Sequence, residues 1–367
     1  MKIAARALAV LGILLFAAAD AGAAGHQVRI PFSMRSWDLE TPDGETVEIS
    51  QWVGMSWVNV AMAEQWDLAF ATSASGTDVT AAADASLSGT KNLRTQVFGT
   101  LSDDRLLLQG GLNLPTGKTE LTAEEISVAR ALWNPVLGFP VRSLGEGFGG
   151  NLGLSWAQPA GDSWVLGIGG SATMSGAFTV AEGGEEYRPG NVFSLTAGAD
   201  GRFDPLTLHL DATSRFFGKD QEDGEEIFQE GSQFETRGGG TYASGSFSLS
   251  ARLLTIIKSR NTYISGGSSG VVETKQNAGR SMKLSGEARL QVHDAWGIGL
   301  AGEWIDFSDR EADEETGSAT GFGPVVTFHP SEPFSVFGRY MILSGSLASG
   351  ATDLSGQDVS VALAWTP

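Results

Sequence analysis

The stretch Gln357-Asp358-Val359-Ser360-Val361-Ala362-Leu363-Ala364-Trp365-Thr366-Pro367 decides the fold class. From Val359 to Trp365, large apolar side chains alternate strictly with small or polar ones. Because successive side chains of a strand point to opposite faces, this run predicts a β-strand with one apolar face. Such a face contacts lipid in a transmembrane β-barrel, whereas in a soluble antiparallel sheet it covers a core. The rest of the chain discriminates between these two interpretations.

The N-terminus has the pattern of a cleaved export signal. The basic segment Met1–Arg6 precedes an apolar run, Ala7–Ala19, and Ala19-Asp20-Ala21 or Ala21-Gly22-Ala23 offers a cleavage site with small residues. The apolar run is shorter than the ~20 residues that a spanning helix needs. We therefore expect a signal peptide over 1–23 and one barrel domain over 24–367.

The composition of the 367-residue chain fits an outer-membrane barrel. The absence of cysteine excludes a disulfide framework, a thiolate metal site, a cysteine nucleophile and a lipoprotein anchor. The 10 Trp and 19 Phe against 4 His favour aromatic girdles over a metalloenzyme, so neither a metal nor another cofactor is expected. The formal charge of −19 argues against a nucleic-acid partner. A soluble sheet remains the alternative, but one with this many strands and no cysteine is an unusual soluble domain.

Runs with a period of two, separated by turn residues, extend along the whole chain. They predict an all-β, antiparallel, up-and-down barrel of roughly sixteen strands. The expected strands are 28–37, 46–61, 66–74, 92–101, 105–115, 149–158, 163–178, 191–203, 206–217, 232–242, 246–260, 280–292, 296–307, 322–329, 334–343 and 357–365.

The connections between these strands alternate between short and long. The short ones are expected at 62–65, 102–104, 159–162, 204–205, 243–245, 293–295 and 330–333. Because outer-membrane barrels have short periplasmic turns and long outer loops, both termini then lie on the periplasmic side. The first hairpin is the weakest assignment, since its outer turn Thr41–Gly44 is short. Without that hairpin the barrel would have fourteen strands.

Charged side chains within the strands share the polar face, which we expect to line the lumen, because a charge facing lipid at mid-membrane costs ~2–4 kcal/mol. Besides Arg29, Arg35, Lys258, Asp200, Asp211 and Glu235, the predicted pore-lining residues are Arg94, Arg202, Arg215, Arg237, Arg252, Lys283, Glu287, Arg289, Glu303 and Arg339. This wall is mixed but tilted towards positive charge. The acidic excess is assigned to outer loops, at 38–48, 182–186, 220–230 and 309–315. The wall charges either brace the barrel or select solutes, and both roles are compatible.

The longest connection, Gly117–Gly147, is the third outer loop. Within it, Thr122-Ala123-Glu124-Glu125 has the form of a capping box, which predicts a helix to about Trp133, and Pro135 would end it. One hypothesis is that this loop folds inward and constricts the pore, with Glu120, Glu124 and Glu125 near wall arginines. The alternative is a helix lying across the outer rim.

Three segments resemble a known family. Gly110–Lys118 is similar to the "G-L-x-L-P-T-G" strand end of outer-membrane transporters associated with meta-cleavage phenol degradation, and more distantly of the long-chain fatty-acid transporter group. Gly145–Leu152 and Glu186–Asn191 resemble the strand starts of the same family. The resemblance covers residues 50–260 and implies passage of small, often hydrophobic or aromatic molecules. Fatty-acid transporters also carry an N-terminal hatch, for which this sequence leaves little room.

The leading functional hypothesis is a non-enzymatic channel or facilitated-diffusion transporter in the bacterial outer membrane. Its partners would be membrane lipid, lipopolysaccharide and a small solute, and an oligomer is compatible with the sequence. A structural or interaction barrel, such as an adhesin or a sleeve for another exported protein, is the alternative. A hydrolase using His209, Asp211 and Thr213 on one strand face is a further possibility, but no nucleophile elbow accompanies these residues.

Overall fold

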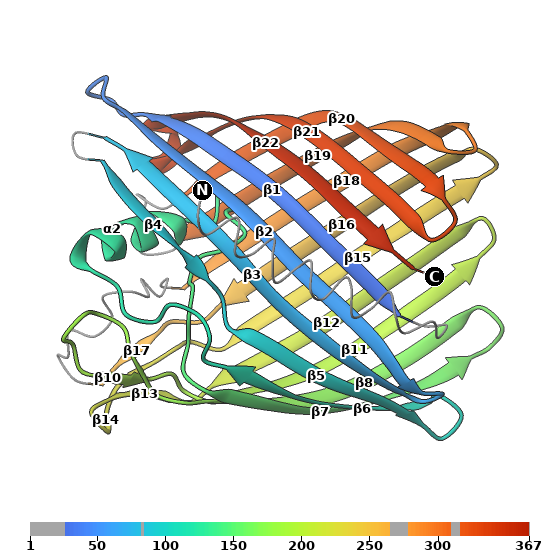
Figure 1. Ribbon diagram of the computed structural model, residues 1–367, viewed down its shortest axis with the longest axis horizontal. Helices are drawn as coiled ribbons and strands as arrows, with labels where there is room; N and C mark the ends of the chain where they lie inside the picture. The colour runs from blue at the N-terminus through green and yellow to red at the C-terminus, as the bar shows by residue number, and fades with distance from the viewer. Residues whose placement is uncertain (1–25, 82–83, 265–277, 310–315, 367) are drawn as a thin grey trace.

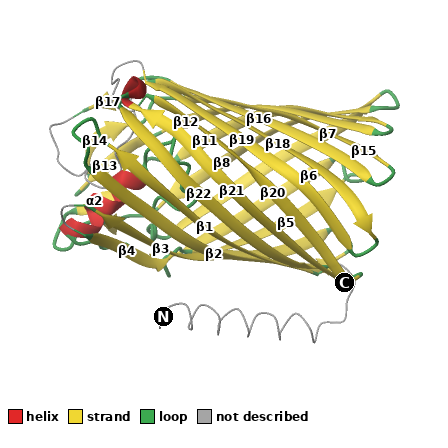
Figure 2. Cartoon of the chain, turned by 90° about the horizontal axis from the view of Figure 1, so that it is seen from above, coloured by secondary structure: helices red, strands yellow, loops and turns green. Residues whose placement is uncertain are grey.

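The computed structural model describes residues 26–81, 84–264, 278–309 and 316–366, and these form a closed antiparallel barrel of 16 strands (Figures 1 and 2). The barrel closes because β1 (Gln27–Glu40) pairs with β2 (Thr46–Ala63) on one side and with β22 (Thr352–Trp365) on the other. Between β2 and β22, each strand pairs with the next. These strands are β3 (Trp66–Thr80), β4 (Ala85–Thr90) continued by β5 (Leu93–Leu101), β6 (Leu106–Leu114), β7 (Gly149–Ala160), β8 (Trp164–Ser175), β11 (Val192–Phe203), β12 (Leu206–Phe217), β15 (Gln233–Ser244), β16 (Phe247–Lys258), β18 (Gly279–His293), β19 (Trp296–Asp309), β20 (Gly317–Ser331) and β21 (Phe334–Leu347).

The first hairpin is part of the barrel, so the predicted sixteen strands are confirmed and the fourteen-strand alternative is wrong. Its turn is closed by hydrogen bonds from Thr41 N to Glu45 O and from Gly44 N to Thr41 O, both 2.9 Å long. Gly44 has a φ of +79°, in the left-handed region that favours glycine. A tight turn therefore replaces a long loop at this position.

Exposed apolar side chains cover the outside of the barrel, and aromatic residues mark its two edges. Trp164, Phe203, Trp296 and Phe334 lie at the short-turn ends of their strands, whereas Phe193 begins β11 at the opposite end. At ~3.3 Å per residue and a tilt of about 40°, the strand from Phe193 to Phe203 rises roughly 25 Å along the axis, the height of the apolar band of an outer-membrane barrel. This surface is therefore lipid-facing, and the protein resides in the outer membrane.

The long connections build a second, smaller sheet at one end of the barrel, which the sequence analysis did not anticipate (Figure 1). It joins segments of three successive outer loops. Its five strands, in spatial order, are β17 (Thr262–Tyr263), β14 (Glu225–Gln229), β13 (Lys219–Glu222), β10 (Glu186–Arg188) and β9 (Phe178–Thr179). A small core of Val180, Tyr187, Ile227 and Phe228 holds it together, and Tyr187 Oη donates a 2.6 Å hydrogen bond to Asp220.

One assignment of an acidic segment to an outer loop is wrong: most of 38–48 belongs to β1 and β2, with only 41–45 between them. These two strands extend beyond the lipid band, where the outward-facing Asp38, Glu40 and Glu48 are in contact with solvent. The segment 220–230 does lie in an outer loop, where it forms the β13–β14 hairpin. The segments 310–315 and 1–23 lie outside the described residues. No helix in the described ranges is long and apolar enough to cross a bilayer.

Candidate functional site

The third outer loop, residues 115–148, contains the expected helix, α2 (Ala123–Leu132). The predicted capping box is confirmed: Thr122 Oγ1 accepts from Glu125 N, and Glu125 Oε2 accepts from Thr122 N. The helix ends at the C-cap residue Trp133, two residues before Pro135. Asn134 Oδ1 then accepts a 3.0 Å hydrogen bond from Val136 N, which turns the chain away from the helix axis.

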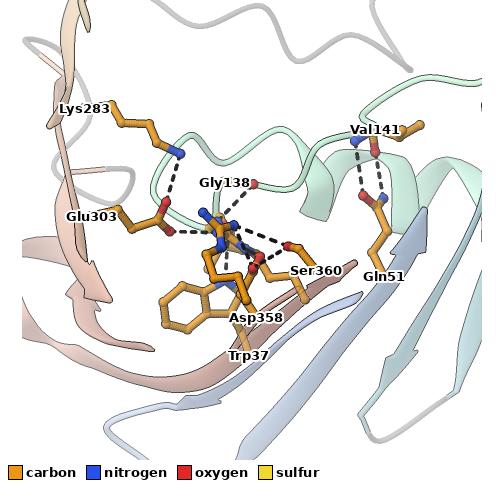
Figure 3. A network of polar contacts seen from close by, with 11 residues as sticks. Trp37, Gln51, Gly138, Val141, Lys283, Glu303, Asp358 and Ser360 are labelled. Atoms are coloured by element: carbon orange, nitrogen blue, oxygen red, sulfur yellow. Dashed lines mark hydrogen bonds and ion pairs between the residues drawn. The ribbon is translucent and has the colours of Figure 1, made fainter. Parts of the chain in front are cut away.

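After the helix, the loop enters the barrel and is bound to the inner face of β1. Arg35 Nη1 donates to the carbonyl oxygens of Leu137 (3.3 Å) and Gly138 (3.1 Å), and Trp37 Nε1 donates to Leu137 O (2.8 Å) (Figure 3). Both wall side chains are almost completely buried. Residues 135–141, which we call the docked segment, therefore lie against the lumen wall and not across the outer rim.

A second attachment lies on β2. The Gln51 side chain donates through Nε2 to Val141 O (2.7 Å) and accepts through Oε1 from Val141 N (3.1 Å), so its amide pairs with the loop backbone as another strand would. Its Nε2 also donates to Thr77 Oγ1 of β3 at 2.9 Å. A buried amide with every polar atom bonded positions the segment precisely, because any displacement leaves a group unsatisfied.

Apolar contacts complete the docking. Leu132, Val136, Leu137 and Phe139 are buried in one cluster with inward-facing residues of the wall, including Trp37, Val53, Met341 and Leu343. Gly138 approaches β19, where a Cβ built on it would lie 3.1 Å from Ile305 Cδ1. From β6, the wall reaches β19 through β5, β3, β2, β1, β22, β21 and β20, which is halfway round the barrel. The loop therefore reaches from its start at β6 to the part of the wall near β19.

An ion-pair network supports the docked segment from the wall. Arg35 pairs with Glu303 of β19 (2.7 Å) and with Asp358 of β22 (3.0 Å). Lys283 also contacts Glu303 (3.0 Å), and Arg339 also contacts Asp358 (2.9 Å) (Figure 3). Arg35 is the member that touches both carboxylates and the loop. Three of the predicted pore-lining residues, Lys283, Glu303 and Arg339, are thereby brought together.

The other predicted pore-lining residues lie on the same inward face, in separate groups. Glu235 pairs with Arg215 (2.6 Å) and Arg237 (2.5 Å). Glu287 pairs with Arg289, which also stacks over Phe337, and Arg94 lies 4.0 Å from Glu146 of the third outer loop. Arg202 and Arg252 are exposed, and no ion pair forms on either of them within the described residues.

The loop glutamates do not meet the wall arginines as expected. Glu125 is bound to Lys118 of its own loop and to the Thr122 cap, while Glu120 and Glu124 are exposed. Burial opposes ionisation of Glu125, yet the hydrogen bonds from Lys118 and Thr122 hold the pKa of its carboxyl below the ordinary value. Backbone carbonyl groups, not carboxylates, are what the loop presents to Arg35.

Sequence reasoning missed Trp37, Gln51 and Asp358 as functional residues. Trp37 and Asp358 are inward-facing because they alternate with the same parity as Arg35 and Ser360 in their own strands, and Gln51 is inward-facing because it lies opposite Arg35 across the β1–β2 pair. No sequence signal indicates that the third outer loop binds Trp37 and Gln51, or that Asp358 pairs with Arg35 beneath it.

His209 and Asp211 share the inward face of β12, but no hydrogen bond joins them within the described residues. The same residues contain no group of three or more His, Asp or Glu arranged to hold a metal ion.

No protein-family model and no curated protein matches the sequence. Similar solved structures include the CymD monoaromatic hydrocarbon channel (12% identity, 94% of this chain and 89% of that one, TM-score 0.45). Also similar is a Pseudomonas aeruginosa FadL homologue, with 10% identity, coverage of 93% of this chain and 90% of that one, and a TM-score of 0.45. A bacterial polysaccharide outer membrane secretin has 9% identity, coverage of 93% of this chain and 98% of that one, and a TM-score of 0.48. At these identities and scores the likenesses assign neither a family nor a function to this chain, and the resemblance to phenol-degradation transporters stays a prediction.

Proposed function

We propose that this protein is a passive outer-membrane channel for small solutes, in which the docked segment narrows the passage. The observation that carries the proposal is the attachment of residues 135–141 to the inner face of β1 and β2 through Arg35, Trp37 and Gln51. A barrel of this strand number encloses space for water unless an internal element fills it. An internal loop fixed to one wall reduces the cross-section of that space.

The wall formed by β7 and β8, away from β1 and β2, supports a passage beside the loop. On the inward faces of β7 and β8, between the outward-facing Leu, Ile and Trp side chains, lie mainly small residues such as Gly149, Gly167, Gly169 and Ser171. Small side chains leave the lumen wide along this wall. Bulky side chains and the docked segment occupy the other side. The proposed passage therefore runs between the docked segment and this wall of small residues.

The solute would be small because the docked segment is held rigidly and so cannot move aside for a larger molecule. Its attachments combine charged hydrogen bonds, a doubly bonded amide and a buried apolar cluster, so they define a fixed constriction. The narrower hypothesis of hydrophobic or aromatic solutes rests on the sequence resemblance. Permeation rates of phenol compared with those of a sugar of similar size would test that part separately.

Planar-bilayer recordings test the channel itself. We expect the folded wild-type protein to conduct, and a variant with residues 135–141 replaced by a Gly-Ser linker of the same length to conduct more. Heat-modifiable migration in gel electrophoresis checks folding of both proteins. The control is Gly224→Ala, in the turn of the β13–β14 hairpin of the outer sheet. It should leave conductance unchanged. Folded wild-type protein that carries no current would refute the channel.

A further inference from the structure

In three interior groups, around Glu235, Glu303 and Asp358, the acidic side chain is buried and at least one basic partner is much more exposed, while Arg35 is buried together with its two carboxylates. The side chain of Glu235 is 5% exposed, whereas those of its partners Arg215 and Arg237 are 28% and 59% exposed. Glu303 is 5% exposed and its partner Lys283 is 40% exposed. Asp358 is 6% exposed beneath Arg339 at 28%. The carboxylates therefore adjoin the wall, and the cations cover them.

The cations also exceed the carboxylates within these groups. Glu235 lies between two arginines, and Glu303 and Asp358 share three cations, Arg35, Lys283 and Arg339. Each group therefore keeps a positive charge after pairing. The formal charge of the whole chain is −19, so the lumen has the opposite sign to the rest of the molecule.

Nearby acidic side chains do not cancel this excess. Asp211 lies directly opposite Arg237 in the β12–β15 pair. The inward faces of β11, β12, β15 and β16 together carry Arg202, Arg215, Arg237 and Arg252 against Asp200, Asp211 and Glu235, so one positive charge remains. Arg237 binds Glu235 through Nε, and 59% of its side chain remains exposed. An ion in the passage can therefore reach this guanidinium group.

We propose that the passage selects small anions, organic carboxylates included, and that Arg237 with Arg215 on the β12–β15 wall forms the cationic surface they meet. This inference rests on the proposed channel function. A charged lining between low-dielectric walls concentrates ions of the opposite sign. Guanidinium groups suit this role because their paired donors match the two oxygens of a carboxylate.

The reversal potential across a bilayer in a KCl gradient tests the proposal. We expect wild-type current to be carried mainly by chloride, and acetate to permeate when it replaces chloride. Arg237→Glu changes the side-chain charge by two units. For an ion that passes ~8 Å away in water with about 0.1 M salt, this change lowers the chloride-to-potassium permeability ratio roughly fivefold. The matched control is Arg280→Glu, the same change on the outward face, where Arg280 pairs with Asp306, and it should leave the ratio unchanged.

The possible outcomes separate the two proposals. Current carried mainly by potassium, or an unchanged ratio in folded Arg237→Glu, overturns the anion inference and leaves the channel standing. Complete absence of current in folded wild-type protein overturns the channel, and the inference with it. If Arg237→Glu does not fold, Arg237→Gln replaces it, and a ratio equal to that of the wild type then overturns the inference.

Discussion

Replacing Arg35 with alanine should release the docked segment from the wall. The guanidinium of Arg35 bonds to the carbonyl groups of Leu137 and Gly138 and to the carboxylates of Glu303 and Asp358. After the substitution, Glu303 retains Lys283 and Asp358 retains Arg339, so neither carboxylate is left without a cation. The loop carbonyls lose their charged donor, and the buried space of the side chain is vacated.

The magnitude follows from the bonds that are lost. A hydrogen bond from a charged donor contributes about 1.5–3 kcal/mol, so the two bonds to the loop contribute about 3–6 kcal/mol to docking. Since about 1.4 kcal/mol changes an equilibrium tenfold, the undocked population should rise by a factor of at least about 100. Trp37 and Gln51 still hold the segment, so we expect exchange between docked and undocked states and not permanent release.

Single-channel recording and limited proteolysis of the detergent-solubilised protein measure this exchange. We expect Arg35→Ala to show steps to a higher conductance and faster cleavage within 133–143. The matched control is Arg339→Ala, which removes another cation from Asp358 but makes no hydrogen bond to the loop in the described structure. Equal conductance and equal cleavage rates for Arg35→Ala and the wild type would show that Arg35 does not hold the loop.

Three further changes test the same region. Gly138 has a φ of +61° and an added Cβ would collide with Arg35 Nη1, so Gly138→Ala should loosen the segment, while Gly161→Ala, at φ +72° in open space, should not affect cleavage of the loop. Gln51→Leu leaves the buried N–H and C=O of Val141 without partners, which costs about 1–3 kcal/mol each, and should raise the proteolysis rate, whereas rates equal to the wild type would contradict the assigned docking. Because the folded-state pKa of Glu125 is lowered, its contribution to loop stability is present above the unfolded carboxyl pKa of about 4.3 and lost as pH falls through the folded value. Proteolysis below that pH should therefore accelerate in the wild type but not in Glu125→Gln.

The barrel was predictable because every membrane-spanning strand must present apolar side chains to lipid on its outward face. Apolar side chains at alternate positions, as from Val359 to Trp365, define the outward face, and the charges then fall on the inward face. The helix in the third outer loop was also predictable, since the Thr122–Glu125 capping box is a local signal. In both cases the sequence signal comes from residues that are close together in the chain.

The docking and the second sheet depend on contacts between distant residues. Arg35 meets Gly138, 103 residues away, through a backbone carbonyl that any residue type supplies. The strands of the outer sheet span only two to five residues, too few to show a period. Asp38, Glu40 and Glu48 suggested a loop because the outward face of β1 and β2 becomes acidic where these strands extend past the lipid, while Trp37 and Ile49 keep the inward face apolar.

The pairing of β1 with β22 has a consequence for biogenesis. Arg35 comes from the first strand and Asp358 from the last, 323 positions apart, and the same guanidinium holds the docked segment. The binding site for that segment is therefore incomplete until the final strand, β22, has inserted and paired with β1. Intermediates inserted in the membrane before that moment would lack a complete attachment site for the docked segment, so the order of events during assembly places the internal element last.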